Sequence, residues 1–196
     1  MDTLRYVLGF LLVIALPPGI TWWFLVHPFV GFWRRLGAGM TMTVMLIYMF
    51  GTLGALYTIR ETLMGADLGT SPPLVVVGLL LMGAGAYVSF KRRTYLTAWI
   101  LAGGPEVHAD EEKRGKLLDE GPYAIIRHPR YVEILLIAFG YAAVSNHVGP
   151  YVVAVLTFPL LHLVVLLEER ELRDRFGDAY RDYSARVPRY IPRRGA

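Results

Sequence analysis

Long stretches without a charged residue are the feature that most constrains how this chain can fold. Four apolar blocks contain no Asp, Glu, Lys or Arg, at residues 6–26, 38–59, 73–90 and 151–167. A fifth block, residues 131–144, is shorter and contains Glu133. A helix that crosses the hydrocarbon core of a bilayer needs about 20 predominantly apolar residues, with a lower limit near 17. The blocks therefore predict an all-α, polytopic membrane helical bundle with about five transmembrane helices.

The composition supports a membrane protein and excludes several kinds of site. Of the 196 residues, 55% are hydrophobic and 18% are charged, whereas about a quarter of the residues in soluble domains are charged. The chain contains no cysteine and five separated histidines, so we expect no disulfide, no cysteine nucleophile and no metal site. The net charge of +4 does not indicate a nucleic-acid partner, because the basic residues flank the apolar blocks.

We expect a single membrane domain over residues 1–196, organised in two parts. Residues 1–90 form a three-helix part, and the first helix is expected to be retained because no small-residue cleavage site accompanies it. Gly78, Gly83 and Gly85 would permit close helix approach in the third span. The second part, from residue 91 onward, contains a charged loop, a helical hairpin and a tail.

The distribution of basic residues predicts the orientation of the bundle. Residues 91–130 contain eight Lys and Arg, and residues 168–196 contain eight more. Basic segments remain on the cytosolic side of a membrane. Five crossings then place the C-terminus in the cytosol and the N-terminus outside. We expect an integral protein of a plasma, inner or ER-like membrane, surrounded by membrane lipids; the sequence does not indicate its oligomeric state.

Two groups of polar residues are predicted to meet at one end of the hairpin. Only residues 145–150 separate the last two apolar blocks, so these blocks should form antiparallel neighbours. Arg127-His128-Pro129 precedes the first helix of the hairpin and Glu168-Glu169 follows the second. Proline restricts the backbone of His128 away from helix, and non-helical backbone at membrane depth usually lines a protein cavity. The plainer interpretation is that these residues anchor helices at the headgroups.

The tail after the last block reads as a charged helix with one apolar stripe. The last span should continue into the cytosol as a helix and break at Gly177-Asp178, which resembles a helix end followed by a new N-cap. Apolar residues recur at helical spacing across this break, at Leu172, Phe176, Tyr180 and Tyr183. We expect this stripe to fold back against the charged loop or the membrane surface.

Two motifs in the C-terminal half resemble the isoprenylcysteine carboxyl methyltransferase and phospholipid methyltransferase family. The first comprises Leu117-Leu118, Gly121-Pro122-Tyr123, Arg127-His128-Pro129 and Tyr131. The second comprises Glu168-Glu169, Leu172, Phe176-Gly177, Tyr180, Tyr183, Val187-Pro188-Arg189 and Ile191-Pro192. The paired motifs, in this order and spacing, are specific, whereas either one alone would be a weak signal.

The resemblance implies a membrane-embedded methyltransferase that uses S-adenosylmethionine and acts on a lipophilic acceptor entering from the bilayer. By position, one wall of the cofactor pocket would be shaped by Tyr123, His128, Pro129 and Tyr131. Glu168 and Glu169 would face the ammonium or sulfonium end of the cofactor. Arg127 or Arg189 would pair its carboxylate, because a pocket of low dielectric constant needs fixed charges of both signs.

Two residues depart from the family pattern near the start of the hairpin. Arg130 stands where an apolar or small residue is usual, and Glu133 stands where a small residue is common. An ionisable residue inside a span is a functional candidate, so Glu133 is either a general base for the acceptor or the partner of Arg130 or Arg127. Glu133 and Arg127 are the candidate catalytic residues.

Two other functions remain open from the sequence. NADPH-dependent membrane sterol and steroid reductases share the helical hairpin and an Arg-His-Pro-x-Tyr segment, but they usually continue with Gly-Glu where this chain has Glu133-Ile134. A non-enzymatic membrane scaffold or transporter subunit is the third possibility. Transporters place polar groups near the middle of the bilayer, whereas this chain gathers them at one face.

Overall fold

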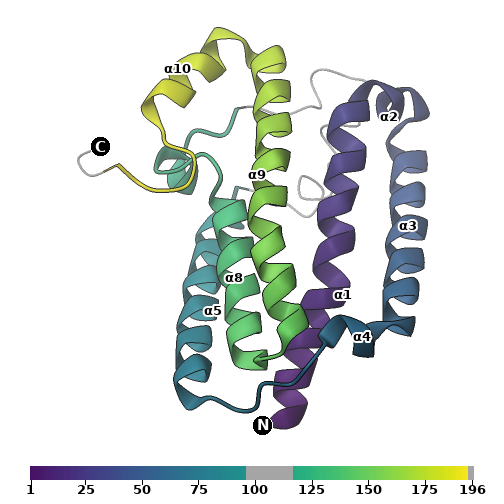
Figure 1. Cartoon of the computed structure of the whole chain (residues 1–196). Helices are drawn as coiled ribbons and strands as arrows, with labels where there is room; N and C mark the ends of the chain where they lie inside the picture. The colour runs from purple at the N-terminus through teal and green to yellow at the C-terminus, as the bar shows by residue number, and fades with distance from the viewer. Residues whose placement is uncertain (96–116, 194–196) are drawn as a thin grey trace.

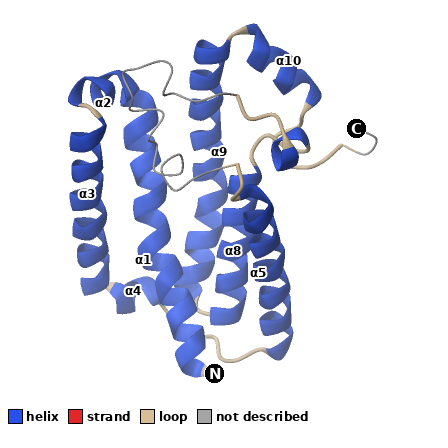
Figure 2. Ribbon diagram, turned by 180° about the vertical axis from the view of Figure 1, so that it is seen from behind, coloured by secondary structure: helices blue, strands red, loops and turns tan. Residues whose placement is uncertain are grey.

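The computed structural model describes residues 1–95 and 117–193 of the chain. Most of the predicted charged loop, which the family resemblance implies is a part of the cofactor pocket, lies outside the described residues. The described part is all-α and contains no β-strand, as Figures 1 and 2 show. The predicted fold class is confirmed.

Five long helices correspond to the five apolar blocks. They are α1 (Asp2–Val26), α3 (Ala38–Thr58), α5 (Pro72–Arg92), α8 (Pro129–Ser145) and α9 (Val148–Phe176). Shorter elements connect or extend them: η1 (His27–Phe29), α2 (Val30–Leu36), α4 (Arg60–Met64), η3 (Gly121–Ala124) and α10 (Asp178–Arg186). Within the described residues, four stretches are long and apolar enough to cross a membrane, and these contain α1, α3, α5 and α9.

Helix α8 has 17 residues, at the lower limit for a membrane crossing. It packs against α5 along its length and also contacts α1 and α9, so other helices surround much of its surface (Figure 1). Its position inside the bundle explains how it can carry Glu133, because this side chain faces protein rather than lipid. The span expected for residues 131–144 is thus present as helix α8, which packs between other helices of the bundle.

The predicted hairpin is tighter than the sequence suggested. Asn146 adopts a left-handed backbone conformation, with φ of 50°, and its N–H donates to the carbonyl of Ala142 at 2.8 Å. A non-glycine residue adopts this conformation most readily when it is asparagine or aspartate. Only Asn146 and His147 separate α8 from α9, so the two helices run antiparallel and side by side.

Close packing of α5 against α8 depends on glycine at two of the three predicted positions. A Cβ atom on Gly78 would lie 2.7 Å from the carbonyl oxygen of Gly140, and one on Gly85 would lie 2.7 Å from Ile137. Both positions therefore need the absence of a side chain. Among the described residues, nothing lies within 4 Å of a Cβ built on Gly83, so the prediction of close helix packing at Gly83 was wrong.

The two ends of the bundle differ in character. The end of the bundle near Arg5 is closed by structural contacts: the buried Arg5 side chain binds Asp67 and donates to the carbonyl of Gly69 at 2.8 Å, and Asn146 donates to the same carbonyl. The opposite end collects the end of α5, the start of α8 and the C-terminal part of α9 (Figure 1). The antiparallel arrangement of α8 and α9 thus brings the predicted polar groups to one end.

Candidate functional site at the open end of the hairpin

The segment before α8 is held in a fixed, non-helical shape by the tail. The N–H of Arg127 donates to the carbonyl of Pro188 at 2.8 Å, and the N–H of His128 donates to the carbonyl of Arg189 at 3.1 Å. His128 has φ of −123° and ψ of 57°, which is outside the helical region that a following proline disfavours. The two motifs that are far apart in the sequence therefore form one backbone unit.

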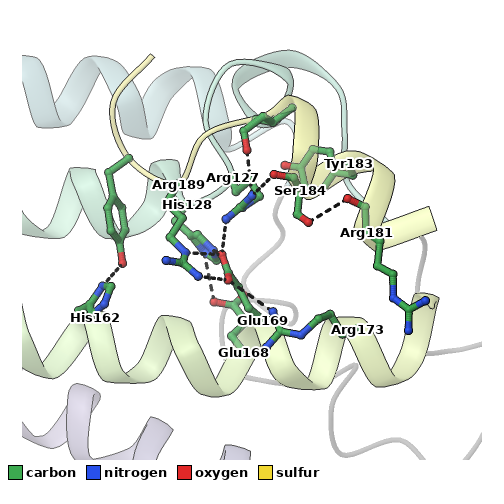
Figure 3. A network of polar contacts seen from close by, with 12 residues as sticks. Arg127, His128, His162, Glu168, Glu169, Arg173, Arg181, Tyr183, Ser184 and Arg189 are labelled. Atoms are coloured by element: carbon green, nitrogen blue, oxygen red, sulfur yellow. Dashed lines mark hydrogen bonds and ion pairs between the residues drawn. The ribbon is translucent and has the colours of Figure 1, made fainter. Parts of the chain in front are cut away.

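Glu169 is the centre of a charged network that joins both motifs. It accepts hydrogen bonds from Arg127 Nη2 at 2.9 Å and from Arg189 Nη2 at 2.7 Å, and His128 Nε2 lies 3.2 Å from its Oε1 (Figure 3). Arg173 Nη1 lies 3.7 Å away, one turn along α9. Glu169 is 1% exposed, so this carboxylate is shielded from water and fully surrounded by cations.

Glu168 occupies a different position from its neighbour. Its Oε2 atom accepts a hydrogen bond from the Tyr131 hydroxyl at 2.8 Å and lies 3.6 Å from His128 Nδ1. Its side chain is 28% exposed, and Oε1 has no hydrogen bond to any residue that the structure describes. Of the two glutamates, Glu168 is the one with capacity for a further partner.

His128 lies between the two glutamates and is 4% exposed. Burial by itself lowers the pKa of an imidazole. Here the carboxylates of Glu168 and Glu169, one beside each ring nitrogen, outweigh burial and raise the pKa of His128 above its ordinary value. The ring therefore favours the doubly protonated form, which can donate to both glutamates.

The raised pKa of His128 predicts a pH dependence of stability. A group with a folded-state pKa above its unfolded value stabilises the fold fully below the unfolded pKa, near 6.5, and loses this contribution as the pH rises through the folded pKa. We expect the melting temperature of the native chain to fall as the pH rises from about 6.5 through the folded-state pKa of His128. The melting temperature of His128→Gln should fall less over the same pH range. The measurement is thermal unfolding in detergent between pH 6 and pH 9.

His162→Gln is a control for this pH dependence, because the ring of His162 bonds the hydroxyl of Tyr190 at 3.0 Å rather than a carboxylate. This variant should keep the native pH profile. Identical pH profiles for the native chain and His128→Gln would contradict the proposed charge on His128.

The tail reaches the site through the predicted apolar stripe. Helix α9 continues to Phe176, Gly177 adopts φ of 54°, and α10 begins at Asp178, as expected from the sequence. The stripe packs together with Val187 and with Leu117 from the end of the charged loop. The Tyr183 hydroxyl donates to the carbonyl of Tyr123 at 2.8 Å, which ties α10 to η3.

The structure pairs Glu133 with a residue that the sequence did not single out. Arg92, at the end of α5, donates from Nε to Glu133 Oε2 at 2.7 Å and from Nη2 to Oε1 at 3.1 Å. The expected partners, Arg130 and Arg127, were wrong: Arg130 stacks over the Trp23 ring and Arg127 binds Glu169. Arg92 follows Gly78 and Gly85 at intervals of seven residues, and this spacing could have placed it on the face toward α8.

Tyr123 lies close to both this ion pair and the glutamate network. It is 8% exposed, and burial raises the pKa of its hydroxyl, while the charges of Arg92, Glu168 and Arg130 lie close enough to alter it further. Arg92 and Glu168 thus both lie near Tyr123, at the same end of the bundle. Of the four residues predicted to form one wall, His128 and Tyr131 lie with their ring centroids 5.6 Å apart, and Pro129 begins α8 between them. Tyr123 lies in η3, which contacts α5.

A separate cavity of about 720 Å³ lies between η1, α2 and the C-terminal part of α9. Acidic and basic side chains line it together, among them Arg34, Arg170 and Glu171. The Glu171 carboxylate is 3.1 Å from His27 Nδ1 and 3.4 Å from Arg34 Nη2. These contacts hold α2 against a face of α9 different from the one that carries Glu169.

Comparison with known families decides the classification. The model of the family described as phospholipid methyltransferase matches residues 74–179, which is more than half of the chain. The chain belongs to the phospholipid methyltransferase family. The family match covers most of α5, the charged loop, the hairpin and the start of the tail. It includes Arg92, Glu133 and both predicted motifs apart from residues 180–192. No solved structure matches the chain.

Individual relatives agree with this family assignment. Over 100 residues the chain is 32% identical to the protein-S-isoprenylcysteine O-methyltransferase of Schizosaccharomyces pombe, covering 49% of this chain and 42% of that protein. It is 33% identical to protein-S-isoprenylcysteine O-methyltransferase B of Arabidopsis thaliana, covering 49% and 51%. It is 40% identical over 70 residues to methanethiol S-methyltransferase 1 of Bradyrhizobium diazoefficiens, covering 36% and 24%. The chain thus matches about half or less of the length of these relatives.

Proposed function

We propose that this chain is a membrane-embedded methyltransferase that takes its methyl group from S-adenosylmethionine and delivers it to a lipophilic acceptor. The observation that carries the proposal is that Arg127 and His128 contact Glu168 and Glu169 at one end of the hairpin. The methyltransferase names of the relatives support the reaction class. The acceptor is an isoprenylcysteine-like carboxylate, a phospholipid amine or another small membrane-soluble molecule.

The described residues fit the chemistry of this cofactor. S-adenosylmethionine carries an ammonium, a carboxylate and a sulfonium that donates the methyl group. The site offers an anion with spare hydrogen-bonding capacity at Glu168, whose side chain is 28% exposed. Arg92 adds a buried nitrogen, Nη1, without a hydrogen-bond partner among the described residues. Charges of both signs are therefore available within one partly closed site.

The residues of the site divide the work between them. Glu168 would bind a cationic group of the cofactor, while Glu169 holds Arg127, His128 and Arg189 in place and has no capacity left. This revises the expectation that Arg127 or Arg189 pairs the cofactor carboxylate, because both guanidiniums already bind Glu169. Methyl transfer needs alignment and exclusion of water rather than a covalent intermediate, and a rigid, buried wall supplies both.

We place the site at the cytosolic face of the membrane, with the N-terminus outside. The basic residues gathered at this end of the bundle support this orientation. An acceptor dissolved in the bilayer would then reach the site laterally at the boundary between lipid and water. The family assignment favours methyl transfer over the reductase and scaffold alternatives. Binding of NADPH would distinguish a reductase, and binding of neither ligand would distinguish a scaffold.

Two measurements test the proposal. The first is binding of S-adenosylhomocysteine, the demethylated product, to the purified full chain in nanodiscs. The second is transfer of tritiated methyl groups to fractionated lipids. We expect Glu168→Gln to weaken S-adenosylhomocysteine binding by about tenfold or more, because a charge-assisted hydrogen bond is lost. Its melting temperature should stay close to that of the native chain, since glutamine still accepts the hydrogen bond from Tyr131.

Glu171→Gln is the matched control, three residues further along α9. Glu171 binds His27 and Arg34 instead of the network, so this variant should bind S-adenosylhomocysteine as the native chain does. Binding of NADPH in place of S-adenosylhomocysteine would favour a reductase. No binding of either ligand and no labelled product from any lipid fraction would end the proposal.

A further inference from the structure

Arg92 and Glu133 form an ion pair that is buried where α5 meets α8. Their side chains are 8% and 11% exposed. Glu133 engages the guanidinium from the side, through Nε and Nη2, at 2.7 and 3.1 Å. An arginine bound in this way cannot turn, because two parallel hydrogen bonds fix the plane of the guanidinium.

This geometry leaves one edge of the Arg92 guanidinium open. A guanidinium has five N–H groups, and Glu133 takes one from Nε and one from Nη2. One N–H of Nη1 and the second N–H of Nη2 form the remaining fork, which has the spacing that a carboxylate binds with two oxygens. Nη1 is buried and has no hydrogen-bond partner among the described residues. A buried donor without a partner costs the free energy of its desolvation, so an acceptor bound at this nitrogen would be stabilising.

The open edge lies in the neighbourhood of the candidate site. Helix α5, which ends at Arg92, contacts η3, which carries Tyr123, and the charges of Arg92 and Glu168 both lie close enough to Tyr123 to alter the pKa of its hydroxyl. Arg127 and Arg189, the two arginines that the sequence assigned to the cofactor carboxylate, already bind Glu169. In a ligand with both groups, the carboxylate would bind Arg92 and the ammonium would bind Glu168.

We propose that Arg92, oriented by Glu133, binds the carboxylate of the methyl donor through its open Nη1 edge. This inference rests on the proposed function and adds a binding residue from α5, outside the two motifs. Glu133 is then a positioning residue for Arg92. The competing explanation is that the pair only clamps α5 to α8, in which case Arg92 would contribute to stability and not to recognition of a carboxylate.

Two ligands that differ only by the carboxylate separate these explanations. S-adenosylhomocysteine has the carboxylate, and S-adenosyl-3-thiopropylamine is the same molecule without it. In Arg92→Lys, we expect the Kd for S-adenosylhomocysteine to rise about tenfold or more, because lysine lacks the fork. The Kd for S-adenosyl-3-thiopropylamine should stay within about twofold. The comparison is made by calorimetry on the full chain in nanodiscs.

Controls make the comparison independent of folding. Arg93→Lys, at the exposed neighbouring position, should change neither Kd. Glu133→Gln keeps Arg92 but loosens its orientation, so we expect the same carboxylate-specific loss with a smaller size. If Arg92→Lys fails to fold, Glu133→Gln tests the proposal in its place.

Three outcomes would count against the proposal. An equal loss for both ligands would show a purely structural role of Arg92 and would overturn this inference alone. No loss for either ligand would overturn it as well. If the native chain binds neither ligand, the proposed function itself fails, and this inference fails with it.

Discussion

Replacement of Glu169 by alanine is expected to lower the free energy of unfolding by about 3–5 kcal/mol, because the change leaves buried cations without their counter-charge. Glu169 is 1% exposed and is the shared partner of Arg127, His128 and Arg189. A domain is stable by only about 5–15 kcal/mol, so this loss is a large part of the total. The measurement is reversible unfolding in mixed detergent micelles.

The same substitution should also release the tail. Arg189 loses its two hydrogen bonds to the carboxylate, and we expect proteolysis within residues 177–193 to become faster. Asp178→Ala is the control: Asp178 pairs with Arg181 on the surface, where both side chains are largely exposed, and such a pair contributes about 0–1 kcal/mol. Equal stability of Glu169→Ala and Asp178→Ala would contradict the central place of Glu169.

Replacement of Glu133 alone by leucine is expected to cost about 3–5 kcal/mol, whereas the double change Arg92→Met/Glu133→Leu should recover most of this loss. The single change leaves a buried guanidinium without an anion between α5 and α8. The double change replaces the pair with apolar side chains of similar size. Unfolding measurements on the native chain, both single variants and the double variant complete the cycle.

The double variant also separates stability from binding. We expect it to fold as well as the native chain and still to bind S-adenosylhomocysteine weakly, because the open guanidinium edge is gone. A double variant that binds S-adenosylhomocysteine at native affinity would contradict a binding role for Arg92. A double variant as unstable as Glu133→Leu would show that the cost comes from lost packing rather than from an unpaired charge.

The helices and their order were predictable because bilayer thickness converts apolar length directly into secondary structure. The meeting of His128 with Glu168 and Glu169 was also predictable, since two neighbouring helices joined by a short turn must bring their far ends together. Even the break at Gly177 followed from the sequence, because glycine adopts a positive φ at a helix end without steric cost.

The pairing inside the site could not be predicted from spacing. Arg127, Arg189 and Glu169 were each assigned to a ligand, whereas in the structure they bind one another. A sequence indicates which charges gather at one end of a bundle, but side-chain reach over distances of a few ångströms decides which of them pair. Glu168 and Glu169 are adjacent in the chain, and only the direction of each side chain from α9 separates a ligand contact from an internal anchor.

The partner of Glu133 was missed for a related reason. The charged loop between α5 and α8 separates Arg92 from Glu133 in the chain, and Lys91-Arg92-Arg93 reads as a basic boundary of a span. The useful signal was the register of α5: Gly78 and Gly85 face α8, and Arg92 follows them at the same interval. Gly83 is outside this register, and the structure leaves it without a close neighbour.

The most direct test of the account is hydrogen–deuterium exchange of the native chain with and without saturating S-adenosylhomocysteine. The account predicts slower exchange in two separate segments at once, residues 121–128 and residues 184–193, since both form the walls of one site. Exchange at residues 64–71, at the opposite end of the bundle, should not change. Protection of only one of the two segments, or protection confined to the opposite end, would contradict a shared site at the open end of the hairpin.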